Sequence, residues 1–213
     1  MKIKQFTFNI LRENTYVIYD ENSSDCAVID PGMYYPEEER ELVDFFNENN
    51  LVPSKILFTH CHLDHLFGAR FLKSVYPLLK TYADEREQYF ITNVEEQGQM
   101  FGLKMETPPS ISNYVFDGEM ITVANSELKV LSTPGHSPGG VCFYNEKDAV
   151  VFSGDALFAN GIGRTDLYGG SYQNLIQAIQ TKLMTLPENT KVLCGHGPAT
   201  TIGEEKHSNP YIQ

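Results

Sequence analysis

Short runs rich in β-branched and aromatic residues, bounded by polar turns, dominate the first third of the chain. They predict strands over 2–8, 15–20, 26–30 and 55–59. Residues 36–50 instead repeat their apolar positions with a helical period. Pro36 and several glutamates occupy the first turn, where both suit a helix. A second helix is predicted over 65–76, directly after the fourth strand.

The second half of the chain repeats this coarse order of strands, helix and strand. Strands are predicted over 120–125, 127–133, 141–145, 149–154 and 191–195, with a helix over 171–186. The stretch 84–113 is weakly patterned, helical in part over 84–98 and irregular at 107–110, and a short polar tail ends the chain. Helices on only one face of each sheet indicate two layers packed sheet to sheet. We therefore expect an α/β fold, a four-layer αββα sandwich of two mixed sheets with helices outside, as one domain over 1–213.

Charge and composition narrow the classes of partner. The 213 residues contain 28 acidic and 16 basic side chains, a formal net charge of −12, and the basic residues form no cluster. Such a chain repels phosphate backbones, so we expect no nucleic-acid partner. No apolar run is long enough for a membrane span, and residues 1–20 do not resemble a signal peptide. The prediction is a cytoplasmic protein whose four cysteines stay reduced.

The segment THCHLDH, residues 59–65, contains three of the six histidines. His60 and His62 are two positions apart, so an extended loop directs both side chains to one side. Asp64 and His65 begin the next turn and can serve a second ion. Imidazole and carboxylate are ligands of zinc and similar cations, and no structural reason for this density of donors is evident. Cys61 is predicted to point away from the ligands.

Three further donors share the position of His60, just after an apolar strand: His136, Asp155 and His196. Strand ends that feed loops can direct side chains into one crevice. Taken singly, each residue is more often a turn or cap residue, but the 60–65 cluster favours a shared metal site. Asp155 is the carboxylate among them and can bridge two cations. We assign no role to His207, and we interpret Cys194 as a packing residue.

These motifs resemble the metallo-β-lactamase superfamily, in its order: THCHLDH (59–65), TPGHSPGG (133–140), SGDALF (153–158) and CGHGP (194–198). GIGRTDL (161–167) and the chain's ending resemble the short bacterial relatives of glyoxalase II, hydroxyacylglutathione hydrolase. The resemblance implies two divalent metal ions, zinc first, with iron or manganese as alternatives. It places the first ion on His60, His62 and His136, and the second on Asp64, His65 and His196, with Asp155 bridging.

The same resemblance implies hydrolysis of a small-molecule thioester such as S-D-lactoylglutathione by a hydroxide that the two ions share. Asp64 would orient that hydroxide. In this resemblance Arg164 corresponds to the family's cationic glutathione contact, and Tyr168 corresponds to a nearby tyrosine. Arg164 fits a structural ion pair equally well. Full-length glyoxalase II has a helical C-terminal region that helps to hold glutathione, whereas only 17 residues follow His196. The thiol carrier therefore stays open.

Two other functions are compatible with the motifs. Persulfide dioxygenases of the same superfamily use one iron, on the counterparts of His60, His136 and Asp155, and share the GRTD stretch. HGP at 196–198 favours the hydrolase. A metal-stabilised module without turnover is the third possibility, but a shared two-ion site leaves open coordination positions that a structural ion normally lacks.

Overall fold

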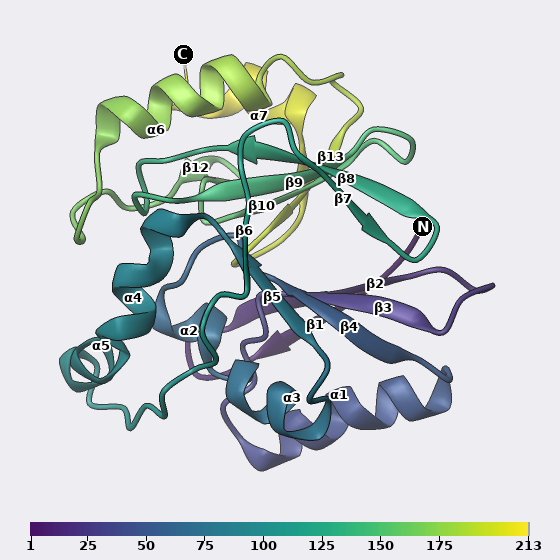
Figure 1. Cartoon of the computed structure of the whole chain (residues 1–213). Coiled ribbons are helices and arrows are strands. Elements are labelled where there is room, and N and C mark those ends of the chain that lie inside the picture. Colours follow the sequence, from purple (N-terminus) through teal and green to yellow (C-terminus); the bar gives the residue numbers. More distant parts are fainter. Residues whose placement is uncertain (213) are drawn as a thin grey trace.

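Two six-stranded sheets pack face to face in the computed structural model, which describes residues 1–212 (Figure 1). The first sheet contains, in spatial order, β1 (Lys2–Phe8), β2 (Glu13–Tyr19), β3 (Asp25–Ile29), β4 (Val52–Leu57), β5 (Lys80–Ala83) and β6 (Asn113–Tyr114). The second contains β14 (Thr200–Thr201), β13 (Lys191–Cys194), β10 (Val150–Gly154), β9 (Val141–Asn145), β8 (Ser126–Ser132) and β7 (Met120–Val123). A separate hairpin pairs β11 (Leu157–Phe158) with β12 (Gly161–Ile162).

Both large sheets are mixed. In the first, β3, β4, β5 and β6 are parallel, and the β1–β2 and β2–β3 pairs are antiparallel. In the second, only the β10–β13 pair is parallel. Helices α1 (Pro36–Glu48) and α3 (Ala69–Val75) cover the outer face of the first sheet, and α6 (Tyr172–Ala178) and α7 (Ile202–Ser208) cover the second (Figure 1). The predicted αββα sandwich is confirmed.

The buried side chains form three layers that match this order. Along β3, Val28 joins the cluster under α1 and α3, whereas Ala27 and Ile29 join the cluster between the sheets. Along β9, Phe143 faces the other sheet and Tyr144 faces α6. Strands that are buried on both faces need an almost continuous apolar sequence, which explains why these runs are so easily recognised.

Two segments differ from the sequence predictions. The predicted helix over 65–76 begins earlier, and it is divided into α2 (Leu63–Leu66) and α3. The division falls at Gly68, whose amide donates to the Pro31 carbonyl instead of to a carbonyl of the helix. A side chain at position 68 would collide with Met33. The polar tail contains α7, whose Ile202 is buried and whose N-cap Thr201 accepts a hydrogen bond from the Glu204 amide. The prediction that only a short polar tail ends the chain was therefore wrong for these residues.

The weakly patterned middle of the chain folds into the short helices α4 (Gln88–Thr92) and α5 (Val94–Met100), after a 3₁₀ turn at Glu85–Glu87. They lie on one side of the sandwich, beside α2 and across the edge where the two sheets meet (Figure 1). Within residues 1–212 no helix has the length and apolar character that crossing a bilayer requires. All four cysteines are buried and form no disulfide, Cys61 and Cys194 included.

Candidate metal centre

Four strand ends from both sheets deliver donors to one place. His60 follows β4 of the first sheet, and His136, Asp155 and His196 follow β8, β10 and β13 of the second. The sheets approach closely here. Gly154 has a positive φ of 49°, and a Cβ at this position would lie 2.2 Å from the Thr59 hydroxyl oxygen. A glycine is therefore required where β10 passes the loop that follows β4.

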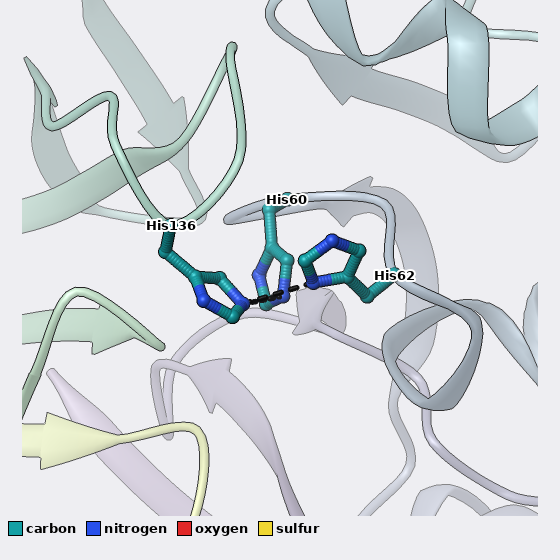
Figure 2. Close-up of side chains that lie close together, drawn as sticks. All are labelled: His60, His62 and His136. Atoms are coloured by element: carbon teal, nitrogen blue, oxygen red, sulfur yellow. Dashed lines mark hydrogen bonds between the residues drawn. The ribbon is translucent and has the colours of Figure 1, made fainter. Parts of the chain in front are cut away.

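The first group of donors consists of His60, His62 and His136, all buried (Figure 2). His136 Nε2 lies 2.9 Å from His62 Nδ1 and 3.2 Å from His60 Nε2. Three ring nitrogens thus point at one small volume from two loops that are 74 residues apart. Imidazole nitrogens arranged in this way match the ligand set of a zinc-type cation.

The second group consists of Asp64, His65 and His196. Asp64 Oδ2 lies 3.1 Å from His196 Nε2 and 3.7 Å from His65 Nε2. Helix α2 produces the separation between the groups, because His62 precedes its first residue whereas Asp64 and His65 lie within it. The turn of this helix directs the second pair of the 60–65 segment away from the first.

Asp155 lies between the two groups. Its Oδ2 is 3.5 Å from His136 Nε2 and 3.7 Å from His196 Nε2, and its Oδ1 is 3.5 Å from His65 Nε2. A single carboxylate therefore reaches both groups, which is the arrangement that a bridging ligand needs. The structure brings together all seven residues that the sequence singled out: His60, His62, Asp64, His65, His136, Asp155 and His196.

Two ligand atoms that face each other in the centre have no hydrogen-bond partner. His65 Nε2 and Asp155 Oδ1 are buried and accept or donate no hydrogen bond within the described chain. A buried polar atom without a partner is costly, and a cation between these two atoms would satisfy both. The chemistry and spacing of the donors therefore fit two divalent ions.

Hydrogen bonds on the far side of the rings fix which nitrogen faces the centre. His136 Nδ1 donates to the Arg164 carbonyl at 2.8 Å, and His196 Nδ1 to the Leu11 carbonyl at 3.1 Å. His65 Nδ1 lies 3.1 Å from Asp30 Oδ2. A carbonyl can only accept, so the two hydrogen bonds leave Nε2 of His136 and His196 free for a cation, as is common for histidine ligands. His62 is different because its Nδ1 faces the centre.

The two groups differ in their proton affinity. Burial lowers the pKa of His60, His62 and His136, and neighbouring imidazoles lower the first two further. Burial also opposes the charged form of His65 and His196, but nearby carboxylates, chiefly Asp64, outweigh it and raise the pKa of both rings. The surroundings therefore favour the neutral form of the rings in the first group and the protonated form of the rings in the second.

Three buried carboxylates support the centre and were not recognised in the sequence. Asp30, the last residue of the strand predicted over 26–30, accepts hydrogen bonds from the Thr59 amide (2.7 Å) and hydroxyl (2.5 Å). Asp30 also lies close enough to His60 and His65 to be a metal ligand with them. Its bonds to Thr59 and its contact with His65 Nδ1 instead indicate that it holds the His65 ring in place. Glu13 lies beyond, 4.0 Å from His65 Nδ1.

Glu87, the third carboxylate, joins the two loops that supply the first group. Its Oε2 accepts from the Cys61 amide and its Oε1 from the Gly139 amide, both at 2.7 Å. Cys61 lies between His60 and His62, and Gly139 lies three residues after His136. Asp30 could have been found from the sequence, because it ends a strand as His60 does. Glu13 and Glu87 carry no such signal.

A cleft of about 380 Å³ opens directly onto the donors, with His62, Asp64, His136, Asp155 and His196 in its lining. Arg164 and Tyr168, the predicted substrate contacts, also line it. The Arg164 side chain forms a two-pronged ion pair with Asp166, with both distances 2.7 Å, and Tyr168 stacks on Tyr89. The open cleft distinguishes this centre from a closed structural metal site.

The fold and the donor pattern define a class of protein, and the sequence comparison agrees with it. The profile of the metallo-β-lactamase superfamily matches residues 9–196, and the chain belongs to this superfamily.

Among individual proteins, the chain is similar over its whole length to hydroxyacylglutathione hydrolase GloC of Haemophilus influenzae, with 35% identity, 100% of this chain and 98% of the relative covered. In structure it is similar to the B3 metallo-β-lactamase BLEG-1, with a TM-score of 0.90, 33% identity and 100% of both chains covered. TTHA1623, solved in a di-iron-bound form, has a TM-score of 0.87 and 34% identity, with 98% and 99% covered. These likenesses support a metal-binding hydrolase.

Proposed function

We propose that the protein is a metal-dependent thioesterase that acts on a small-molecule thioester, with S-D-lactoylglutathione as the first substrate to test. Two divalent ions, zinc first and iron or manganese next, would be held by the two donor groups with Asp155 between them. The observation that supports this most directly is that both groups face one cleft and share one carboxylate. The GloC relative supports the choice of substrate.

The ions would polarise the thioester carbonyl and make a water reactive near neutral pH. Asp64 would orient that water, because its carboxylate lines the cleft and lies between the rings of His65 and His196. Water supplies the oxygen of the new C–O bond, the C–S bond breaks, and the products are a carboxylic acid and a thiol. A thiolate leaves readily, so no strong general acid is needed, and none is evident among the residues of the cleft.

The test compares the metal-loaded protein with protein treated with a chelator and then reconstituted. We expect hydrolysis of S-D-lactoylglutathione or a simpler thioester, its loss with the metal, and its return with two equivalents of zinc, iron or manganese. Metal analysis of the purified protein would count the ions. A loaded protein that cleaves no thioester would refute the proposal.

An iron-dependent persulfide dioxygenase is the second candidate, and one part of the centre is compatible with it. His60, His136 and Asp155 alone form a two-histidine, one-carboxylate set, with His136 Nε2 within 3.5 Å of the other two. Such a set suits non-haem iron that reacts with oxygen. Oxygen consumption with glutathione persulfide, at one iron per chain and without thioester cleavage, would support this candidate. Metal binding without either reaction would indicate a non-catalytic module.

A further inference from the structure

The cleft beside the donors has a wall of aromatic side chains. Phe90 contacts the ligand candidate His62 edge-on, with ring centroids 4.7 Å apart. Tyr89 and Tyr168 stack with centroids 3.5 Å apart and planes 11° from parallel, and Phe90 meets Tyr168 edge-on at 6.0 Å. We call Tyr89, Phe90 and Tyr168 the aromatic wall. Ring contacts link its three members to one another and to His62, and all three residues line the cleft.

Apolar side chains continue the wall at the mouth of the cleft. Met100, the last residue of α5, is 75% exposed and the adjacent Phe101 is 45% exposed, and both line the cleft. Leu11 and Leu167 line it as well. Large apolar side chains that gather around a concave site gain free energy when a ligand covers them, at roughly 25 cal/mol per Å². The wall is therefore suited to hydrocarbon or aromatic groups.

The charges of the cleft do not suit an anionic ligand. Among the lining residues of the described chain, Arg164 is the one arginine or lysine, and Asp166 already engages its guanidinium at two points. Outside the metal ligands the lining also contains the exposed carboxylate of Glu96. Glutathione has two carboxylates and one ammonium group, so outside the metal centre it would find no uncommitted lysine or arginine among the lining residues and would lie near Glu96.

We infer that the preferred substrate is an uncharged thioester with an aromatic or branched aliphatic group, and that glutathione is a poor thiol carrier for this protein. The inference rests on the proposed thioesterase function and specifies its substrate class. The reacting carbonyl would lie at the donors while the apolar group lies against the aromatic wall. The bond changes are those of hydrolysis already given, with no oxidant or reductant involved.

The test uses four thioesters and the metal-loaded protein. They combine two acyl groups, acetyl and phenylacetyl, with two thiols, glutathione and the neutral N-acetylcysteamine, and each kcat/KM is divided by the rate of alkaline hydrolysis of the same compound. We expect about a tenfold gain for each apolar or neutral replacement, so that phenylacetyl-N-acetylcysteamine exceeds acetylglutathione by about 100-fold. Higher values for the glutathione esters would overturn this inference and leave the thioesterase proposal intact, whereas no cleavage of any ester would overturn both.

Two variants separate the wall from the charges. Phe101→Ala should lower kcat/KM about tenfold for the phenylacetyl ester and much less for the acetyl ester of the same thiol. Phe116 is 63% exposed and lies outside the cleft lining. Phe116→Ala is therefore the matched control and should change kcat/KM for neither ester. Asp166→Asn releases Arg164 and should raise kcat/KM for the glutathione esters several-fold without helping the neutral ones. Equal effects of Phe101→Ala on both acyl groups, or of Asp166→Asn on both thiols, would overturn the inference.

Discussion

The two donor groups take most of their residues from one seven-residue segment, 59–65, yet the electrostatic surroundings of their histidines differ. The first group is three buried imidazoles with lowered pKa values, whereas the second is two imidazoles with raised pKa values and the carboxylate Asp64. Carboxylates cause the difference, because Asp30, Asp64 and Asp155 all lie within 3.7 Å of His65. A short histidine motif can therefore contribute to one set of imidazoles with lowered pKa values and one with raised pKa values, depending on which carboxylates lie beside it.

The largest effect is expected where the groups join. Asp155→Ala should remove both ions and lower turnover at least about 1,000-fold, since the ions contribute several kcal/mol to stabilising the transition state. His62→Ala should have a comparable effect through the first group. Metal content and kcat/KM measure the result, with His207→Ala, an exposed position outside the centre, as control. Near-normal turnover in either variant would show that the ligand set is wrong.

Acidification should separate the two groups. In the apoprotein His65 and His196 keep their protons to a higher pH than an ordinary histidine, so a cation must displace them, whereas the first group is already neutral. Affinity at the second group should therefore fall as the pH decreases through these raised pKa values, by up to about tenfold per pH unit for each proton displaced. Metal-binding titrations at a series of pH values from about 8 to 5 should show that the number of ions bound per chain drops from two to one. Simultaneous loss of both ions would contradict the comparison.

Removing the support behind His65 should weaken only the second group. Asp30→Asn replaces the charged partner of His65 Nδ1, and we expect a loss of about 10- to 100-fold in affinity for one ion. Asp44→Asn, an exposed carboxylate on α1, should leave both ions unchanged. Competition with a coloured chelator would resolve the two affinities. An equal loss at both groups would mean that Asp30 supports the whole fold rather than His65.

The smallest change concerns the loops of the first group. Glu87→Gln retains one acceptor oxygen but faces the second backbone amide with a donor, so we expect about 1–3 kcal/mol lower stability and a modest decrease in turnover. Glu85→Gln, exposed in the same 3₁₀ turn, should have little effect. Denaturant unfolding measures the difference. Equal stability of the two variants would show that the loops need no such link.

Much of this arrangement was accessible from the sequence because it follows local rules. Buried strands are continuous apolar runs, and His60, His136, Asp155 and His196 each come just after one. Asp30 obeys the same rule, but Pro31 and Gly32 follow it directly, and an aspartate before such residues is also typical of a turn. Helix α7 was also detectable, because Thr201 and Glu204 form the start of a helix-capping pattern.

Other features depend on contacts that no local pattern encodes. Glu87 bonds to amides 26 and 52 residues away, so its role exists only once the two loops meet. The aromatic wall likewise combines α4 with Tyr168 from a loop of the other half, in a stretch that lacks clear periodicity. The structure shows the Arg164–Asp166 ion pair, but Arg164 also lines the cleft, so its contact with the substrate stays a prediction.

Anomalous diffraction from crystals of the metal-loaded protein tests most directly whether the two donor groups act as one centre. We predict two peaks about 3.5–4 Å apart, one against the three histidines and one against Asp64, His65 and His196, with Asp155 contacting both. One peak at full occupancy, or two peaks of which Asp155 contacts neither, would contradict the account.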